Sequence, residues 1–243
     1  MFGVAGSPMG HGHNYRLGIV LAGEIDPKGG LIAPYEQSAS ALARLRSMLD
    51  HKNLNEEVPL LAGQPITTEC LVRFALERLK TDLPVARVRL YETDDFFAEY
   101  DAKGRFTVGC EDAFHAAHRL HSASLTDDEN REIYDKCNNR SGHGHRYGVQ
   151  AVIGGQFDET SGTLFNLNEL RNGISESLQP WIFRHLDIET NDFRDTPSTG
   201  ENIISTLWPR LNRNLQGRLT GLQLSETLNN RFNLRETEPG VKL

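Results

Sequence analysis

The chain has 243 residues, of which 38% are apolar and 24% are charged, which is the composition of an ordinary globular protein. No apolar run approaches the roughly 20 residues that a membrane-spanning helix needs, and no signal peptide opens the chain, so we expect no membrane partner. A formal net charge of −7 excludes the basic footprint of a nucleic-acid-binding protein. Three scattered cysteines, Cys70, Cys110 and Cys137, indicate no disulfide framework, so we expect a reducing, cytoplasmic compartment.

The sequence contains an internal repeat. Residues 10–23, GHGHNYRLGIVLAG, return as residues 142–155, GHGHRYGVQAVIGG. Matches at one offset of 132 residues join His11 to His143, Gly23 to Gly155, Asp26 to Asp158 and Gly30 to Gly162. Many matches in the same order predict a tandem duplication.

The alignment of the two copies is interrupted once. It slips by five residues where Leu49-Asp50 pairs with Leu186-Asp187, and it recovers where Glu69 pairs with Glu201. The polar stretch Glu99–Gly104 separates the copies. We therefore expect two domains, residues 1–103 and 104–243.

The sequence of the first unit predicts a short series of strands and helices. The alternating segment Tyr15–Glu24 indicates a strand, and Asp26–Gly30 supplies the turn chemistry of a hairpin. A helix is expected over Glu36–Leu49, and a second helix begins with Thr67 as its N-cap. The strand Arg87–Glu92 then leads into a closing hairpin.

The second unit predicts the same order with one addition. Its elements are a strand at Tyr147–Phe157, a turn at Asp158–Gly162, a helix at Asn168–Phe183, a helix capped by Thr199 and a strand at Gly221–Glu226. A further strand, Asp112–His121, opens this unit and has no match in Met1–Met9, so we expect the first unit to be truncated. The order predicts an α+β fold, an antiparallel four-stranded sheet with two helices on one face.

Histidines on two predicted strands suggest a metal site. His143 and His145 are separated by one glycine, so on a strand both imidazoles point to the same face. Such a pair alone is also common on protein surfaces, but the neighbouring strand offers a third imidazole from His118, with His115 and His121 as rivals. Three histidines with an open fourth position are the usual ligands of catalytic zinc.

Cys137 lies six positions before His143, in a polar loop. A cysteine there is an inert small residue unless a cation is near. A zinc ion would favour its thiolate, which could then act as a base or nucleophile.

These residues resemble a known family. The segments FHAAHRLH and LTDDENREIYDKCNNRSGHGH, with GHGHNY, GEIDPKGG, LDHKNL, TTE and YETD in the first unit, resemble 6-pyruvoyl tetrahydropterin synthase. The resemblance implies two tandem T-fold units, whose sheets join edge to edge into barrels. It also implies a zinc-dependent lyase that converts 7,8-dihydroneopterin triphosphate to 6-pyruvoyl tetrahydropterin with loss of triphosphate.

The resemblance assigns roles to individual residues. The zinc ligands would be His118, His143 and His145, and Cys137 would be the catalytic thiol. The pterin would be anchored by Glu226 with Thr199 and Glu201 nearby, and the first unit keeps a similar set in Thr67, Thr68 and Glu92. A carboxylate suits that task because it accepts two parallel N–H donors.

Departures from the family pattern differ between the two units. In the second unit Asp187 is followed by Ile188, so its general base is missing. The first unit keeps that base as Asp50-His51, but it has Ala5 where the second has its cysteine. In this family the Asp-His pair reaches the metal of a neighbouring subunit, so we expect one composite site with Asp50 and His51 as the base.

Two other functions are compatible with the same residues. One is 6-carboxytetrahydropterin synthase of the deazapurine (queuosine) pathway, in which the cysteine usually stands closer to the histidine pair. The other, from a different class, is a pterin-binding protein without turnover. Exposed strand edges make a homo-oligomer the expected state in each case.

Overall fold

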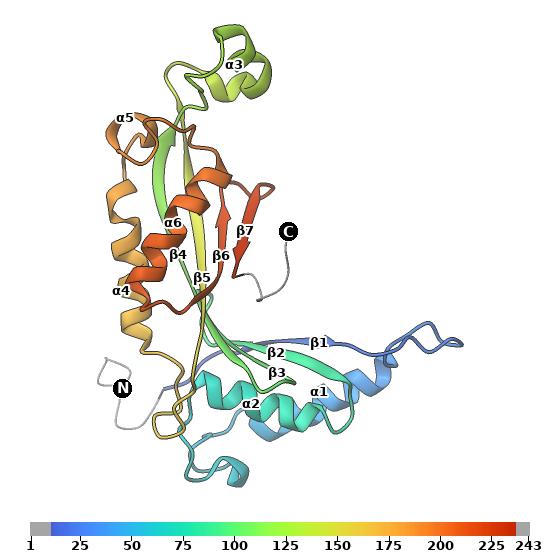
Figure 1. Cartoon of the computed structure of the whole chain (residues 1–243). Coiled ribbons are helices and arrows are strands. Elements are labelled where there is room, and N and C mark those ends of the chain that lie inside the picture. Colours follow the sequence, from blue (N-terminus) through green and yellow to red (C-terminus); the bar gives the residue numbers. More distant parts are fainter. Residues whose placement is uncertain (1–10, 237–243) are drawn as a thin grey trace. The chain divides into compact units, whose positions relative to one another are not determined.

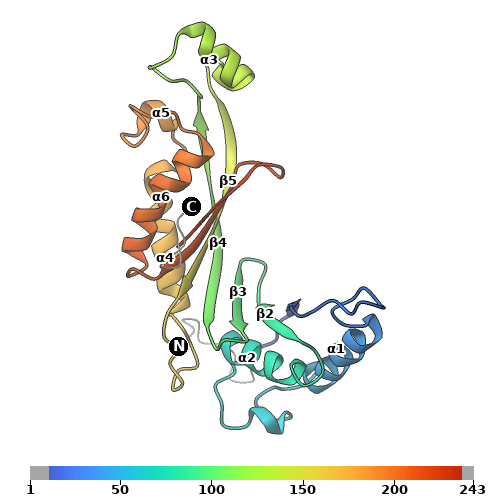
Figure 2. The same cartoon turned by 45° about the vertical axis from the view of Figure 1, so that its right-hand side comes forward.

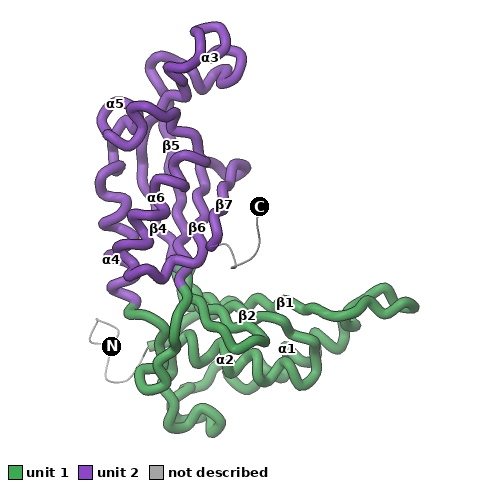
Figure 3. The backbone as a smooth tube through the Cα atoms, viewed as in Figure 1, with its two compact units in different colours: residues 1–109, 154–166 green, residues 110–153, 167–243 purple. Residues whose placement is uncertain are grey.

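The computed structural model describes residues 11–236, which form two compact units (Figure 3). The first unit contains the described residues up to Gly109 together with residues 154–166. The second contains residues 110–153 and the described residues from Leu167 onward. The domain boundary between residues 103 and 104 stays a prediction.

The first unit places two helices against an antiparallel sheet (Figure 1). Its elements are β1 (Arg16–Leu21), α1 (Tyr35–Leu49), a 3-10 turn (Pro59–Leu61), α2 (Thr68–Leu79), β2 (Val85–Tyr91) and β3 (Phe96–Asp101). Strand β2 pairs with β1 on one side and with β3 on the other, both antiparallel. Helix α2 packs on β2 and β3, and α1 packs on α2.

The second unit has the full expected order of elements. They are β4 (Phe106–His118), α3 (Asp127–Tyr134), a 3-10 turn (Asp135–Asn138), β5 (His143–Gly154), α4 (Leu167–Leu178), a 3-10 turn (Gln179–Trp181), α5 (Leu186–Glu189), α6 (Gly200–Asn214), β6 (Leu219–Ser225) and β7 (Arg231–Arg235). Two of these strands run into the first unit, β4 by residues 106–109 and β5 by Gly154. Strands β4 to β7 are neighbours in sequence order, and α4 and α6 lie side by side on one face of their sheet (Figures 1 and 2).

Burial follows the expected periodicities. Along β5, Tyr147, Val149 and Ala151 alternate inward and are almost fully buried. In α6 the inward stripe is Ile203, Leu207 and Leu211, each fully buried, at helical spacing. These side chains form the core between the sheet and the helices, so the α+β fold class is confirmed. None of the helices within residues 11–236 is long and apolar enough to cross a bilayer.

The repeat is visible in the backbone at its constant offset of 132, and the predicted slip of five residues is wrong. His51 and Phe183 both have positive φ, 59° and 56°. The N–H of Asn53 donates to the Glu57 carboxylate at 2.6 Å, and the N–H of His185 donates to the Glu189 carboxylate at 2.6 Å.

The counterparts of Asp50 and His51 are therefore Ile182 and Phe183, rather than Asp187 and Ile188. The slip arose because the dipeptide Leu-Asp occurs near this position in both copies. The second unit still lacks an Asp-His pair at the equivalent place.

The hairpins predicted after β1 and β5 are also wrong. The turn forms, because Gly30 donates its N–H to Asp26 O at 2.8 Å and Gly29 donates to the Asp26 side chain. Only one further backbone bond, Asp26 N–H to Leu31 O, follows it before the chain enters α1. A second strand would need a run of paired residues, and the few residues before the helix leave no room for one.

Candidate metal centre and active site

Strands β4 and β5 bring three histidines together in the second unit. The ligand atoms of His118, His143 and His145 all lie within 4.8 Å of one another. Nε2 of His118 is 3.1 Å from Nε2 of His143. Ligand nitrogens that share one metal ion at about 2.1 Å lie roughly 3.4 Å apart in tetrahedral geometry, so the His118–His143 pair is near that spacing and the cluster could hold a metal ion.

His118 is fixed from outside the cluster. It is 1% exposed, and its Nδ1 donates a hydrogen bond to the carbonyl oxygen of Ser198 at 3.0 Å. This bond leaves Nε2 unprotonated and facing the other two rings, as in many metal sites. Burial, more than the nearby His143, lowers the pKa of His118 and keeps its imidazole neutral.

The other two histidines have buried nitrogens that nothing in the described structure satisfies. Nδ1 of His143 and Nε2 of His145 are buried and have no hydrogen-bond partner among residues 11–236. Orphaned buried polar atoms are costly, and Nε2 of His145, which lies near Glu226 at the cluster, is therefore available to a bound group. Glu226 adds a carboxylate oxygen 3.5 Å from Nε2 of His118 and 3.7 Å from Nε2 of His145.

The two rival histidines face elsewhere. The His115 ring stacks on Phe183 with 6.1 Å between the ring centroids. Nδ1 of His121 is 3.1 Å from the side-chain amide of Asn138. Of the three candidates, the structure therefore brings only His118 to the histidine pair.

The Tyr147 ring contacts the rings of His118 and His145, and Cys137 is bonded through its backbone to the segment that follows His118. The carbonyl oxygen of Cys137 accepts the N–H of Leu120 at 3.0 Å, which ties the cysteine to the chain just after His118. Tyr147 is fully buried, and its hydroxyl has no hydrogen-bond partner among the described residues. Burial, together with the charges of Glu226, Asp187 and Cys137, raises the pKa of Tyr147, so it stays a hydrogen-bond donor.

Sequence reasoning missed Tyr147 and Ser198. The signal for Tyr147 was present, because residues 143, 145 and 147 alternate along one strand and share a face. Ser198 acts through its backbone carbonyl, for which no residue type is diagnostic.

The predicted base, Asp50-His51, is presented to solvent on the first unit. Nδ1 of His51 is 3.1 Å from the Asp50 carboxylate, and the His51 side chain is 90% exposed. A hydrogen bond from Arg46 lowers the pKa of Asp50, which keeps that carboxylate ionised beside the imidazole. The exposed imidazole beside a carboxylate has the chemistry of a general base.

The substrate residues predicted in the first unit have partners already. Thr68 donates a hydrogen bond to the Glu92 carboxylate, which also lies 3.4 Å from Nε2 of His13. Thr67 caps α2 by accepting the N–H of Cys70, and its hydroxyl donates to Gly162 O. The Thr67 hydroxyl therefore already uses its one proton and one of its two acceptor lone pairs.

The residues of the second unit that are equivalent to Thr67 and Thr68 have different surroundings. Thr199 caps α6 by accepting the N–H of Asn202 at 3.4 Å, and Glu201 is exposed. Gly200 replaces Thr68, because the ring of Phe232 occupies the place of a side chain there, 2.1 Å from where its Cβ would lie.

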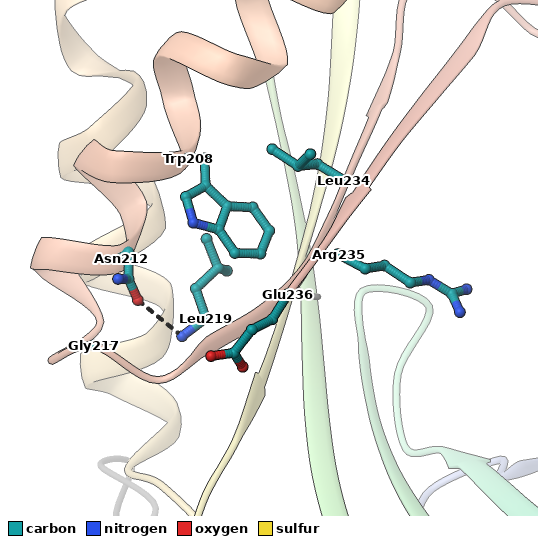
Figure 4. A pocket seen from close by; sticks show the side chains of 7 residues that line it. All are labelled: Trp208, Asn212, Gly217, Leu219, Leu234, Arg235 and Glu236. Carbon is teal, nitrogen blue, oxygen red and sulfur yellow. Dashed lines mark hydrogen bonds between the residues drawn. The ribbon is translucent and has the colours of Figure 1, made fainter. Parts of the chain in front are cut away.

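A separate cavity of about 310 Å³ lies between the end of α6 and strands β6 and β7 (Figure 4). It is lined by Trp208, Leu219 and Leu234 among others, and Asn212 accepts the Leu219 N–H there at 3.2 Å. The lining contains neither histidine nor cysteine. We therefore place the candidate site at the histidine cluster.

The fold and the cluster define an α+β protein of two related sheet-and-helix units, one of which carries a three-histidine site able to hold a metal. A statistical model of the family described as 6-pyruvoyl tetrahydropterin synthase matches residues 5–103 and 107–237. The chain therefore belongs to the 6-pyruvoyl tetrahydropterin synthase family.

Individual relatives agree with this membership. The 6-pyruvoyl tetrahydrobiopterin synthase of Poecilia reticulata is 40% identical over 108 residues, which are 44% of this chain and 74% of that protein. The human protein of the same name is 38% identical over 120 residues, 49% of this chain and 83% of its own length. The structure of Caenorhabditis elegans 6-pyruvoyl tetrahydropterin synthase aligns with a TM-score of 0.52 at 36% identity, covering 54% of this chain and 95% of that one.

These findings confirm the family resemblance, the T-fold and the class of the protein, which is an enzyme of the lyase class. The relatives' names do not favour the 6-carboxytetrahydropterin synthase alternative.

Proposed function

We propose that the protein is a zinc-dependent lyase that converts 7,8-dihydroneopterin triphosphate to 6-pyruvoyl tetrahydropterin with release of triphosphate. The observation that carries this proposal is the cluster of His118, His143 and His145, with the orphaned Nε2 of His145 and the closeness of Glu226. Family membership supplies the reaction class, and the cluster supplies a place for the metal.

The roles of the second unit's residues follow from their chemistry. Zinc held by the three histidines would supply a Lewis acid that acidifies substrate hydroxyls. Cys137 is the thiol that moves a proton, and the Tyr147 hydroxyl donates a hydrogen bond to the bound ligand. Glu226 has the carboxylate that two parallel N–H groups of a pterin would recognise.

The base comes from Asp50 and His51 of a neighbouring copy of the first unit. The second unit has Ile182 and Phe183 at the equivalent positions, so it has no Asp-His pair there. The two units are complementary, because one has the metal ligands and the thiol and the other has an exposed Asp-His pair. This arrangement requires a homo-oligomer, and the three free cysteines suit a cytoplasmic compartment.

The first unit's Thr68 and Glu92 remain candidates for a second pterin contact. Their mutual hydrogen bond would have to open for a ligand to enter.

The test is metal analysis joined to product analysis. Purified protein should contain close to one zinc per chain, lost in His143→Ala, and should release triphosphate and 6-pyruvoyl tetrahydropterin from 7,8-dihydroneopterin triphosphate. Release of acetaldehyde would identify the carboxy-type reaction instead. Protein that binds the pterin but shows neither turnover nor stoichiometric zinc would be a non-catalytic pterin-binding protein.

A further inference from the structure

A second pair of a histidine and an aspartate lies in the second unit, apart from the proposed base. Nδ1 of His185 is 3.7 Å from the Asp187 carboxylate, and the two side chains are 17% and 18% exposed. That nitrogen is buried and has no hydrogen-bond partner among residues 11–236. A buried polar atom without a partner lowers the free energy of unfolding, so stability alone does not explain His185.

The backbone of His185 is held beside the end of strand β4. Helix α5 lies next to the end of β4 that carries His118 (Figures 1 and 2). The N–H of Ala117 donates to Arg184 O at 2.9 Å, and Ala117 forms a parallel bridge with His185. The N–H of His185 donates to the Glu189 carboxylate at 2.6 Å. The imidazole therefore starts from a fixed point beside the residue that precedes His118.

The Asp187 side chain reaches the end of strand β4. Its carboxylate accepts the N–H of Arg119 at 2.8 Å, and Arg119 directly follows His118 in the chain. This bond fixes the backbone on the far side of a candidate metal ligand. A negative charge at this place also favours a cation bound nearby.

The His185 side chain reaches the start of strand β5. A Cβ on Gly142 would lie 2.7 Å from Nε2 of His185 and 2.9 Å from the carbonyl oxygen of His118. Gly142 directly precedes His143, so the imidazole packs where the two strands that carry the metal ligands meet. Nδ1 faces Asp187 and Nε2 faces Gly142, which favours a positioning role over the role of a base.

The first copy of the repeat has the same local backbone without this pair. Asn53 and Asn55 stand at the positions of His185 and Asp187, at the offset of 132 residues. The Asn53 side chain accepts the N–H of Asn55 at 3.1 Å, which is a contact within the turn itself. The described part of the first unit holds no cluster of three histidines. The pair therefore occurs in the copy that has the metal cluster.

We propose that His185 and Asp187 are positioning residues of the metal centre, which hold the end of β4 and the start of β5 so that His118 and His143 keep the spacing that a metal ion needs. Groups that orient metal ligands from outside affect affinity strongly, and the loss of one weakens binding by roughly 10–100-fold. The proposal rests on the proposed metal site, but not on the identity of the reaction.

Metal affinity tests this role without the use of activity. Zinc binding is measured by competition with a chromophoric chelator, and cobalt(II) in place of zinc reports the ligand geometry through its visible spectrum. His185→Asn and Asp187→Asn should each weaken zinc binding by roughly tenfold and shift the cobalt bands. Asp187→Asn keeps an oxygen that can accept the N–H of Arg119, so it isolates the charge. The matched control is Arg184→Gln, at an exposed ion pair with Glu189 in the same segment, which should change neither readout.

The two substitutions should be coupled, because the pair acts as a unit. In the double variant zinc binding should stay weakened by about tenfold, close to either single variant, rather than by about a hundredfold. Unchanged affinity in either single variant, or losses that multiply in the double variant, would overturn the proposal.

Thermal unfolding of the metal-free protein separates this role from a merely structural one. Metal-free His185→Asn should keep a Tm close to that of the wild type, because an asparagine there can accept the N–H of residue 187, as Asn53 does for Asn55 in the first copy. A lower Tm with unchanged zinc affinity would overturn the proposal and leave the proposed function intact. Wild-type protein that binds no zinc would overturn both.

Discussion

Replacing Tyr147 by phenylalanine removes only the hydroxyl that has no partner in the described structure. Tyr147 is 0% exposed, and its ring packs on Phe114 with 4.9 Å between centroids. Phenylalanine keeps this packing. The substitution therefore isolates the hydroxyl from the rest of the side chain.

The expected change in stability is opposite to that of most core substitutions. A buried polar group without a hydrogen bond costs about 1–3 kcal/mol. Tyr147→Phe should therefore raise the free energy of unfolding of the metal-free protein by about 1 kcal/mol, which is roughly 2–4 °C in Tm for a chain of this size. The same change should lower turnover about tenfold, because the hydroxyl donates to the bound ligand.

Calorimetry of metal-free and zinc-loaded protein measures the first effect, and steady-state kinetics measures the second. Phe114→Leu is a suitable control, since it disturbs the packing and leaves the hydroxyl. If Tyr147→Phe lowers the Tm of the metal-free protein, the hydroxyl has a stabilising partner there. The assignment of that hydroxyl to the ligand would then be wrong.

The remaining predictions concern a turn, a buried carboxylate and the metal itself. A Cβ at Gly142 would lie 2.7 Å from Nε2 of His185 and 2.9 Å from the His118 carbonyl. Gly142→Ala should therefore lower the free energy of unfolding by more than the roughly 1–2 kcal/mol that a left-handed alanine costs, and should lower the zinc content. Gly63→Ala, which has open space around it, should lose only the backbone contribution. Burial raises the pKa of Glu69 above its ordinary 4.5. The free energy of unfolding should therefore fall as the pH rises from 4.5 through the raised pKa. Chemical unfolding of Glu69→Gln at several pH values should show no such fall. Chelation should lower Tm in the wild type and leave the Tm of His118→Ala unchanged, because that variant has no site for the metal to stabilise.

Spacing and alternation were enough to predict the histidine pair, since two residues on a strand always share a face. They did not distinguish His118 from His115 and His121, because that choice depends on strand pairing and on the Ser198 carbonyl. The sequence alignment paired Asp50 with Asp187 because the dipeptide Leu-Asp occurs in both copies. The true counterpart of His51 is Phe183, which shares its positive φ, and a positive φ at phenylalanine has no sequence signal. Residues 154–166 join the first unit through contacts with Thr67 and Glu69, and such long-range pairing has no sequence signal.

The central claim is that one active site draws its metal ligands and thiol from the second unit and its base from the first unit of another copy. Coexpression of two inactive variants, His51→Ala and Cys137→Ala, tests it most directly. Mixed assemblies should regain roughly a quarter of wild-type activity per site, because half of the copies supply each intact residue. Mixed assemblies that stay inactive, or a His51→Ala variant with full activity by itself, would contradict the account.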